Sequence, residues 1–319
     1  MPGNMYPSIY YRRILINSMG EFDQYLTKGM HVSSIGHEIQ LWGIRDYSDV
    51  EIKGISVHWP DEWNAFNPDS FDDEDYDPPR SLRLECAKDV ADSAGIPLFW
   101  VGEHNANWRE LQGTAEIGII ERDGSKFSSD TQDVDIDPDS GGTGRSEMEG
   151  LLQNIMGTNL SKYDTDKEEN RRITPIQNWV RSNMPEYYTV VDIDILVGDG
   201  DGSAKGFVEI RRSDWANSSE GGRPIRNWWP WLSDRRNYYI LSDTAEKAGV
   251  QPILIQHLPE PLSDDSEVGF YTNLAFRRFD WDSVKGYDWY ASEEKAREWL
   301  GFDVEYMAAS EAAKRLQNL

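Results

Sequence analysis

Short apolar runs, separated by polar and glycine-rich segments, dominate the chain and predict an α/β protein. The runs 97–101 and 252–257 are typical of buried strands. Each of them follows an alanine-containing segment that ends at Gly95 or at Gly249, as a helix does when a glycine lies just past its last turn. The order in each half of the chain is therefore predicted to be helix, strand, strand, helix, strand.

Two sequence blocks occur twice, in the same order. Residues 53–64 resemble residues 205–217, and residues 87–99 resemble residues 241–254. We therefore expect a tandem duplicated α-β-β-α-β fold with mixed central sheets and a helical C-terminal tail. The predicted units are a first domain at 1–122, an acidic Gly/Ser/Asp linker at 123–150, and a second domain at 151–319. Within the tail, helices are expected at 292–300 and 308–316.

A predicted strand pair in the second half, 190–197 and 206–212, is joined by the glycine-rich turn 198–202. The charged side chains on these strands include three carboxylates and a cation: Asp192, Asp194, Glu209 and Arg211. Because side chains alternate along a strand, the two aspartates should share one face, and the glutamate and the arginine should share one face of the next strand. Such a cluster among apolar neighbours is unfavourable unless something compensates its charge, and a divalent metal with oxygen ligands is the usual compensation. The pair is therefore a candidate active site.

With these residues, the second half resembles the PD-(D/E)xK nuclease superfamily, which includes Holliday-junction resolvases and many restriction enzymes. The family pattern is a helix, an Asp on one core strand, Glu-x-Lys on the next, then a helix and a further strand. Here residues 174–181 would supply the first helix, Asp194 the aspartate, and 235–249 the second helix. Glu209 and Arg211 would occupy the Glu-x-Lys positions. The resemblance covers residues 165 to 280.

The resemblance implies a metal-dependent DNA endonuclease or a resolvase-like phosphodiester hydrolase. Asp192, Asp194 and Glu209 would bind Mg²⁺ or Mn²⁺, and the metal would lower the pKa of bound water and neutralise charge on the phosphate oxygens. Asp194, Glu209 and Arg211 would be the catalytic residues. Arg211 departs from the family lysine, because a guanidinium can grip a phosphate but stays protonated. Lys205 or Lys247 is the alternative source of an ammonium group.

The first half resembles a degenerate copy of the second. An offset of 152 residues brings Val57 to the position of Glu209 and Trp59 to that of Arg211. Gln40 or Trp42 then falls near the aspartate positions. No metal site is expected there, so the chain resembles a fused pseudo-dimer with one active half.

Further substrate contacts are expected around the candidate site. Aromatic residues at 227–232, followed by arginines, are suited to stacking on bases and clamping phosphates, or alternatively to forming a hydrophobic plug or a subunit contact. Gln256 is either a polar partner of the site or a core residue with a satisfied hydrogen bond. The substrate-binding candidates are Arg212, Trp228, Trp229, Arg235, Arg236, Lys247 and Gln256.

The acidic composition bears on whether the protein can bind DNA. Asp plus Glu number 57 against 32 Lys plus Arg, for a formal net charge of -25, and 32 Asp accompany only 11 Lys. This composition resembles that of haloarchaeal proteins. In molar salt the Debye length is about 3 Å, so net charge does not exclude a DNA substrate. Counterion release would contribute little to affinity.

The lone Cys86 excludes an intramolecular disulfide and a thiolate-rich zinc site, and it is expected in the core. No apolar run is long enough to span a membrane. We therefore expect a protein of the cytoplasm of a haloarchaeal host or of a virion, whose partner is DNA, a second copy or another protein.

Two alternatives to the enzyme remain open. One is a catalytically inactive nuclease-fold protein that acts as a structural, assembly or nucleic-acid-binding module in a virion or a defence complex. The other is a buried ion cluster of the carboxylates with Arg211 and Arg212.

Overall fold

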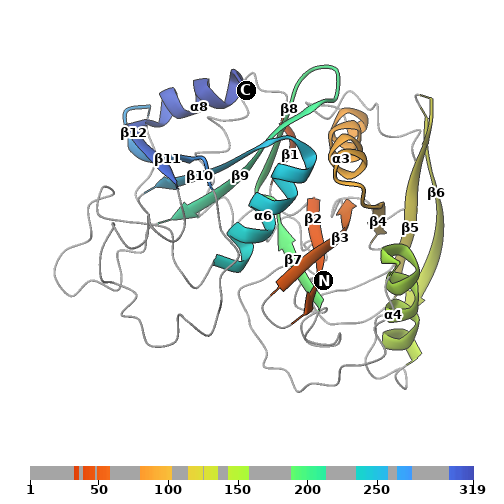
Figure 1. Cartoon of the computed structure of the whole chain (residues 1–319). Coiled ribbons are helices and arrows are strands. Elements are labelled where there is room, and N and C mark those ends of the chain that lie inside the picture. Colours follow the sequence, from red (N-terminus) through yellow and green to blue (C-terminus); the bar gives the residue numbers. More distant parts are fainter. Residues whose placement is uncertain are drawn as a thin grey trace, which may run out of the picture.

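The computed structural model describes residues 32–35, 39–46, 49–57, 80–102, 114–124, 126–135, 143–157, 188–212, 235–257, 264–274 and 302–319 (Figure 1). The elements in the first half are β1 (Val32–Ile35), β2 (Ile39–Asp46), β3 (Asp49–Val57), α3 (Arg80–Ala94), β4 (Leu98–Gly102), β5 (Thr114–Asp123), β6 (Lys126–Asp135) and α4 (Thr143–Met156). Those in the second half are β7 (Tyr188–Asp192), β8 (Ile195–Gly198), β9 (Ala204–Arg212), α6 (Arg235–Ala248), β10 (Gln251–His257), β11 (Glu267–Thr272), β12 (Asp303–Ala308) and α8 (Ala309–Gln317). None of the described helices is long and apolar enough to cross a membrane.

The strands form two six-stranded sheets, in the orders β6-β5-β4-β3-β2-β7 and β1-β8-β9-β10-β11-β12. Each sheet is mixed, with one parallel pair, β3 with β4 and β9 with β10. Helix α3 connects the first of these pairs and α6 the second, and the two helices pack against each other (Figure 1). The prediction of an α/β protein with mixed sheets is confirmed.

The antiparallel pair next to the parallel pair, β2 with β3 and β8 with β9, has the same irregularity in both sheets. In the first sheet β2 pairs with β3, and the register shifts between Trp42 and Gly43. In the second sheet β8 pairs with β9, and the register shifts between Val197 and Gly198. The two bulges therefore occupy equivalent positions, each just before a glycine.

The parallel pairs also share one register. Ile55 is the partner of Leu98 in the first sheet, and Phe207 is the partner of Pro252 in the second. These partners are the residues that the repeated sequence blocks align with each other. The strand order, the orientation and the register are thus the same for β2, β3 and β4 in the first sheet as for β8, β9 and β10 in the second.

Helices α3 and α6 end in the same way. Gly95 (φ 67°) and Gly249 (φ 70°) follow them in the left-handed region, which favours glycine. The amide of the next residue, Ile96 or Val250, donates to the carbonyl oxygen five residues earlier at 2.9 Å in both helices. This is the helix-ending motif that the glycines predicted.

The first strands of the two halves are exchanged. Strand β1 belongs to the first half but pairs with β8, and β7 belongs to the second half but pairs with β2. The expectation of one continuous strand at 190–197 is therefore wrong: β7 ends at Asp192 in one sheet, and β8 begins at Ile195 in the other. Strand β7 forms its backbone hydrogen bonds with β2, and β8 forms its own with β1 and β9. The chain passes from one sheet to the other at Ile193 and Asp194.

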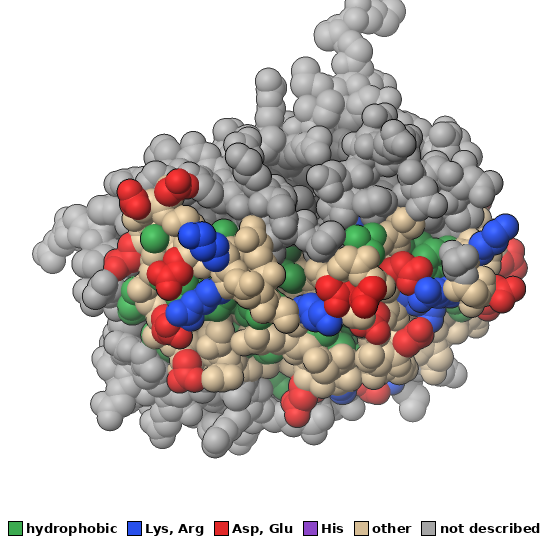
Figure 2. Space-filling view, turned by 90° about the horizontal axis from the view of Figure 1, so that it is seen from above, with side chains coloured by type: hydrophobic (Ala, Val, Ile, Leu, Met, Phe, Trp, Pro, Cys, Tyr) green, Lys and Arg blue, Asp and Glu red, His purple; other side chains and the backbone are tan. Residues whose placement is uncertain are grey.

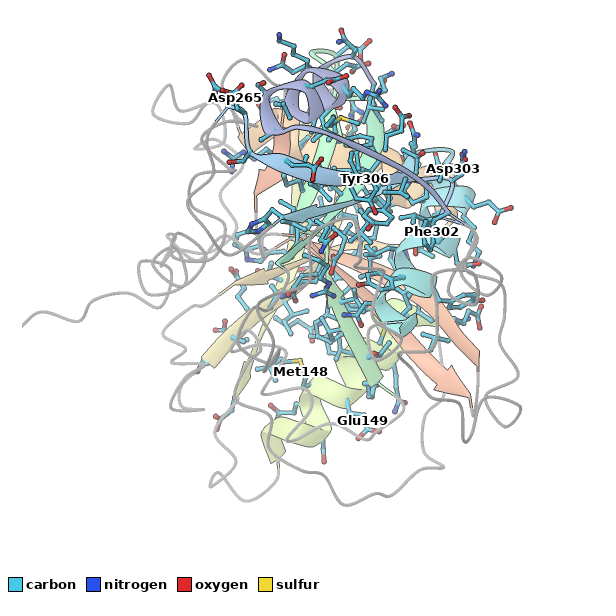
Figure 3. The ribbon with its side chains drawn as sticks, turned by 90° about the vertical axis from the view of Figure 1, so that its left-hand side faces the viewer. Met148, Glu149, Asp265, Phe302, Asp303 and Tyr306 are labelled. Atoms are coloured by element: carbon cyan, nitrogen blue, oxygen red, sulfur yellow. The ribbon has the colours of Figure 1, made fainter. Side chains whose placement is uncertain are left out.

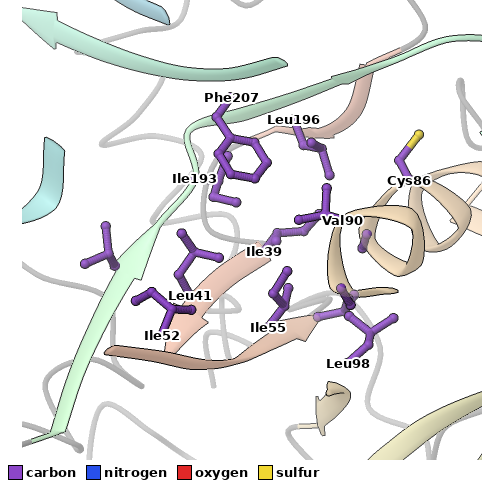
Figure 4. Close-up of a cluster of buried hydrophobic side chains, with 14 of the residues drawn as sticks. Ile39, Leu41, Ile52, Ile55, Cys86, Val90, Leu98, Ile193, Leu196 and Phe207 are labelled. Carbon is purple, nitrogen blue, oxygen red and sulfur yellow. The ribbon is translucent and has the colours of Figure 1, made fainter. Parts of the chain in front are cut away.

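The largest core cluster lies between the two sheets and includes residues of α3, α6 and both sheets. Figure 4 shows Leu41 and Ile55 from the first sheet facing Leu196 and Phe207 from the second. Cys86, on α3, is fully buried in this cluster, as the sequence predicted. The halves therefore share a core as well as their first strands.

Two segments differ from the sequence prediction. The expected linker at 123–150 contains β6 and much of α4. Strand β6 is polar because it lies at the edge of its sheet and buries only Phe127 and Val134, so it lacks the alternating apolar pattern of a core strand. In the tail, β12 precedes α8. The helices expected at 174–181 and 292–300 lie outside the described residues.

Candidate functional site

The candidate site lies on the face of the second sheet that α6 approaches. Glu209 and Arg211 share one face of β9 because they are two residues apart. The parallel register places Leu254 beside the glutamate and Gln256 beside the arginine. Helix α6 contacts both strands, and its Tyr238 lies over the arginine, with the ring centroid 5.6 Å from Cζ.

Glu209 and Arg211 form an ion pair, with the arginine Nη2 2.6 Å from Oε1 of the glutamate. The glutamate side chain is 7 % exposed and that of the arginine 28 %. A carboxylate buried to this degree requires a compensating charge, and the guanidinium supplies it.

Asp194 lies next to this pair on the neighbouring strand segment. Strand β8 pairs Ile195 with Val208, and one further step along the same register brings Asp194 across from Glu209. The Oδ2 atom of Asp194 accepts a hydrogen bond from the backbone amide of Ile210 at 2.7 Å. The register therefore places the two acids across from each other on neighbouring strand segments.

Asp192 is placed differently from the expectation. It ends β7 in the first sheet, where its Oδ1 atom accepts a hydrogen bond from Nε2 of Gln40 at 3.1 Å. The two aspartates therefore do not share the face of one strand. Among the described residues, no three His, Cys, Asp or Glu side chains form a group that could hold a metal ion. In the described part of the chain, Asp194 and Glu209 are therefore the two acids that remain as candidate metal ligands of this region.

Gln256 is fully buried beside Arg211. Its Oε1 atom accepts a hydrogen bond from the hydroxyl of Tyr271 at 3.3 Å, while its Nε2 atom has no hydrogen-bond partner in the described part of the chain. Strand β11 carries Gly269 next to it, and a Cβ atom there would meet the Tyr271 ring at 2.8 Å. Figure 3 shows the β12 side of this sheet, with Tyr306 labelled, and α4 at the opposite end of the molecule.

The two lysines considered as substitutes for the family lysine have acidic partners. Lys247 forms an ion pair with Asp243 one turn earlier on α6, at 2.8 Å. Lys205 forms one with Asp199 across the turn between β8 and β9, at 2.7 Å. On the face that Figure 2 shows, acidic and basic side chains are likewise interspersed.

The turn between β8 and β9 is the hairpin that the glycines predicted. Oδ1 of Asp199 accepts the backbone amides of Ser203 at 2.9 Å and of Asp201 at 3.3 Å. Hydrogen bonding with Asp201, and then with Lys205, holds the pKa of Asp199 well below its usual range.

The remaining predicted substrate contacts fall outside the described part of the chain. Trp228 and Trp229 lie outside the described residues, as do the side chains of Arg212, Arg235 and Arg236.

The first half has apolar residues at the equivalent positions. Strand β2 pairs Ile39 with Val57, so the registers make Ile39 the counterpart of Asp194 and Val57 the counterpart of Glu209. Both apolar residues are buried in the core between the sheets. The sequence offset identified Val57 correctly but missed Ile39, because the turn between the two strands differs in length between the halves.

One buried carboxylate in the first half was missed by the sequence analysis. Glu116, on β5, is 5 % exposed. It accepts hydrogen bonds from the indole of Trp100 at 3.3 Å and from the hydroxyl of Thr131 at 2.5 Å. Its only signal in the sequence is an acid inside the apolar run of β5, where both partners come from neighbouring strands.

No protein-family model, curated protein or solved structure matches this chain.

Proposed function

We propose that the second half is a metal-dependent phosphodiester hydrolase of the PD-(D/E)xK type that acts on DNA, and that the first half is a degenerate copy of the same fold. The order of elements supports this proposal. An aspartate precedes β8, Glu-x-Arg lies on the antiparallel strand β9, and α6 leads to the parallel strand β10. From the aspartate onward, this order agrees with that of the family pattern.

The observation that carries the proposal is the difference between the halves at the same positions. Ile39 and Val57 occupy the places of Asp194 and Glu209, and the fold accepts them in its core. The acids are therefore not needed to form the sheet. Burying charge costs stability even when it is paired, so we infer that the second half retains its acids for binding or catalysis.

The two acids suit a hard divalent cation. Carboxylate oxygens are the ligands that Mg²⁺ prefers, and Asp194 and Glu209 offer them from adjacent strands. The metal would supply an activated water and charge neutralisation at the phosphate. Because Oε1 of Glu209 now accepts from Arg211, metal binding at the glutamate would release the guanidinium to grip the phosphate.

A nicking assay with supercoiled DNA, in molar KCl with Mg²⁺ or Mn²⁺, tests the proposal. We expect cleavage by the wild type and a loss of about 100-fold or more in Asp194→Ala and in Glu209→Gln, because each removes a metal ligand. Glu305→Gln is the matched control, since this exposed carboxylate lies on the edge strand β12 and pairs with Arg315 of α8. Cleavage that persists unchanged in both site variants would contradict the assignment.

A second candidate is a non-catalytic module of the same fold that serves assembly or nucleic-acid binding. It is favoured by an arginine in place of the family lysine, held by Glu209 at 2.6 Å. In this case the wild type would not nick DNA with any divalent metal. The site variants would only change thermal stability, and light scattering would reveal an oligomer or a complex with DNA.

A further inference from the structure

Gln40 is a polar residue in a position that the other half fills with an apolar one. It pairs with Ser56 across β2 and β3, and the equivalent pair in the second sheet is Ile195 with Val208. The glutamine is 0 % exposed. Its Oε1 atom has no hydrogen-bond partner among the described residues, and its Nε2 atom donates to Asp192.

This glutamine is therefore not explained by folding alone. A buried carbonyl oxygen without a hydrogen bond destabilises the folded state, and Ile195 shows that the same position of the fold accepts an aliphatic side chain. The one side-chain hydrogen bond that Gln40 makes among the described residues, to Asp192, points to what the residue does.

That hydrogen bond leads to the candidate site along three consecutive residues. Asp192 is held by the Gln40 side chain at 3.1 Å. The amide of Ile193 donates to the backbone carbonyl of Ile39, also at 3.1 Å. Asp194 follows, and its carboxylate accepts from the Ile210 amide. The first half thus holds the chain at the two residues directly before Asp194.

We infer that Gln40 is a positioning residue for Asp194. It fixes the point where the exchanged strand β7 leaves the first sheet, and it thereby sets the orientation in which Asp194 meets Glu209 and the Ile210 amide. The degenerate half would then serve as a clamp for the site of the other half. The importance of this clamp for activity rests on the proposed function, but its existence does not.

Hydrogen exchange of the Ile210 amide, measured by NMR on the full chain, reports the Asp194 hydrogen bond directly. In Gln40→Leu we expect this amide to exchange at least about tenfold faster, because Asp194 is released, while the melting temperature stays the same or rises. A merely structural glutamine would give no local change at Ile210. Unchanged exchange in a folded Gln40→Leu protein would overturn the inference.

Ser56→Ala is the matched control. Ser56 is the cross-strand partner of Gln40 and is equally buried, and its hydroxyl accepts from the Trp42 indole at 2.7 Å. Its loss should lower the melting temperature without accelerating exchange at Ile210. Acceleration at Ile210 equal to that in Gln40→Leu would mean that any weakening of the first sheet reaches the site, and would overturn the specific role of Gln40.

Asp192 gives a second, independent pair of variants in case Gln40→Leu does not fold. Asp192→Asn keeps an oxygen acceptor for Gln40 and should retain protection of the Ile210 amide. Asp192→Ala should lose it. Equal exchange in both variants would overturn the inference. The readout needs neither metal nor DNA, so its failure would leave the nuclease proposal standing, and an absence of nicking would leave the positioning role standing.

Discussion

The two halves of the chain form the same sheet with different residues at the same place. Strands β2, β3 and β4 of one sheet and β8, β9 and β10 of the other have the same order, the same register and the same bulge. On the face toward the central helices, the first half has Ile39 and Val57 where the second has Asp194 and Glu209. The fold thus depends on registers and helix ends rather than on the charges. The chain contains its own control for deciding which residues serve structure.

The largest expected effect comes from introducing a charge at the apolar position of the first half. Val57→Glu would bury a carboxylate with no described cation beside it, so we expect the free energy of unfolding to fall by about 3–5 kcal/mol. Chemical denaturation measures this loss. Glu51→Gln, at an exposed position of the same strand, should change stability by less than about 0.5 kcal/mol. A Val57→Glu protein as stable as the wild type would show that the first half tolerates a buried carboxylate at this position.

The shared helix ends should respond equally in both halves. Gly95→Ala and Gly249→Ala each force a side chain into the left-handed region, and in both cases the added Cβ meets no atom within 4 Å. The cost is then purely conformational, about 1–2 kcal/mol for each variant. Thermal unfolding of the two variants should give matching shifts. A difference larger than about 1 kcal/mol would argue against equivalent helix ends.

The turn between β8 and β9 differs from the turn between β2 and β3, and a substitution in it is expected to have a smaller effect on stability. Gly206 lies 8 residues after Gly198, whereas Gly54 lies 11 residues after Gly43. In the short turn, the pKa of Asp199 is lowered by its hydrogen bonds, so its contribution to stability is present above its ordinary pKa of 3.8 and is lost as the pH falls below that value.

Asp199→Asn should therefore flatten the dependence of unfolding free energy on pH between about 4 and 2.5. Denaturation at a series of pH values in that window measures the difference from the wild type. An identical dependence in both proteins would mean that this turn does not stabilise the charged form.

The sequence predicted the elements whose signals are local. Gly95 and Gly249 marked the ends of α3 and α6, and the apolar runs marked β4 and β10. Each of these signals acts within a few residues, so it does not depend on which strand lies beside it.

The strand exchange was not predictable, because the choice of partner strand is a tertiary property. The alternating pattern around Asp192 and Asp194 is the same whether the segment forms one strand or two. Which of the two it forms depends on its pairing with β2 on one side of Ile193 and with β9 on the other. Strand β6 was missed because an edge strand buries few side chains. Glu116 was missed because its hydrogen-bond partners lie on other strands.

The most direct test of a functional site in the second half is thermal unfolding with and without Mg²⁺ or Mn²⁺. A ligand present at 100 times its Kd stabilises the folded state by about 2.7 kcal/mol. We predict a metal-dependent rise in melting temperature for the wild type that disappears in Glu209→Gln and persists in Glu305→Gln. No rise in the wild type, or the same rise in Glu209→Gln, would contradict a metal site at Asp194 and Glu209.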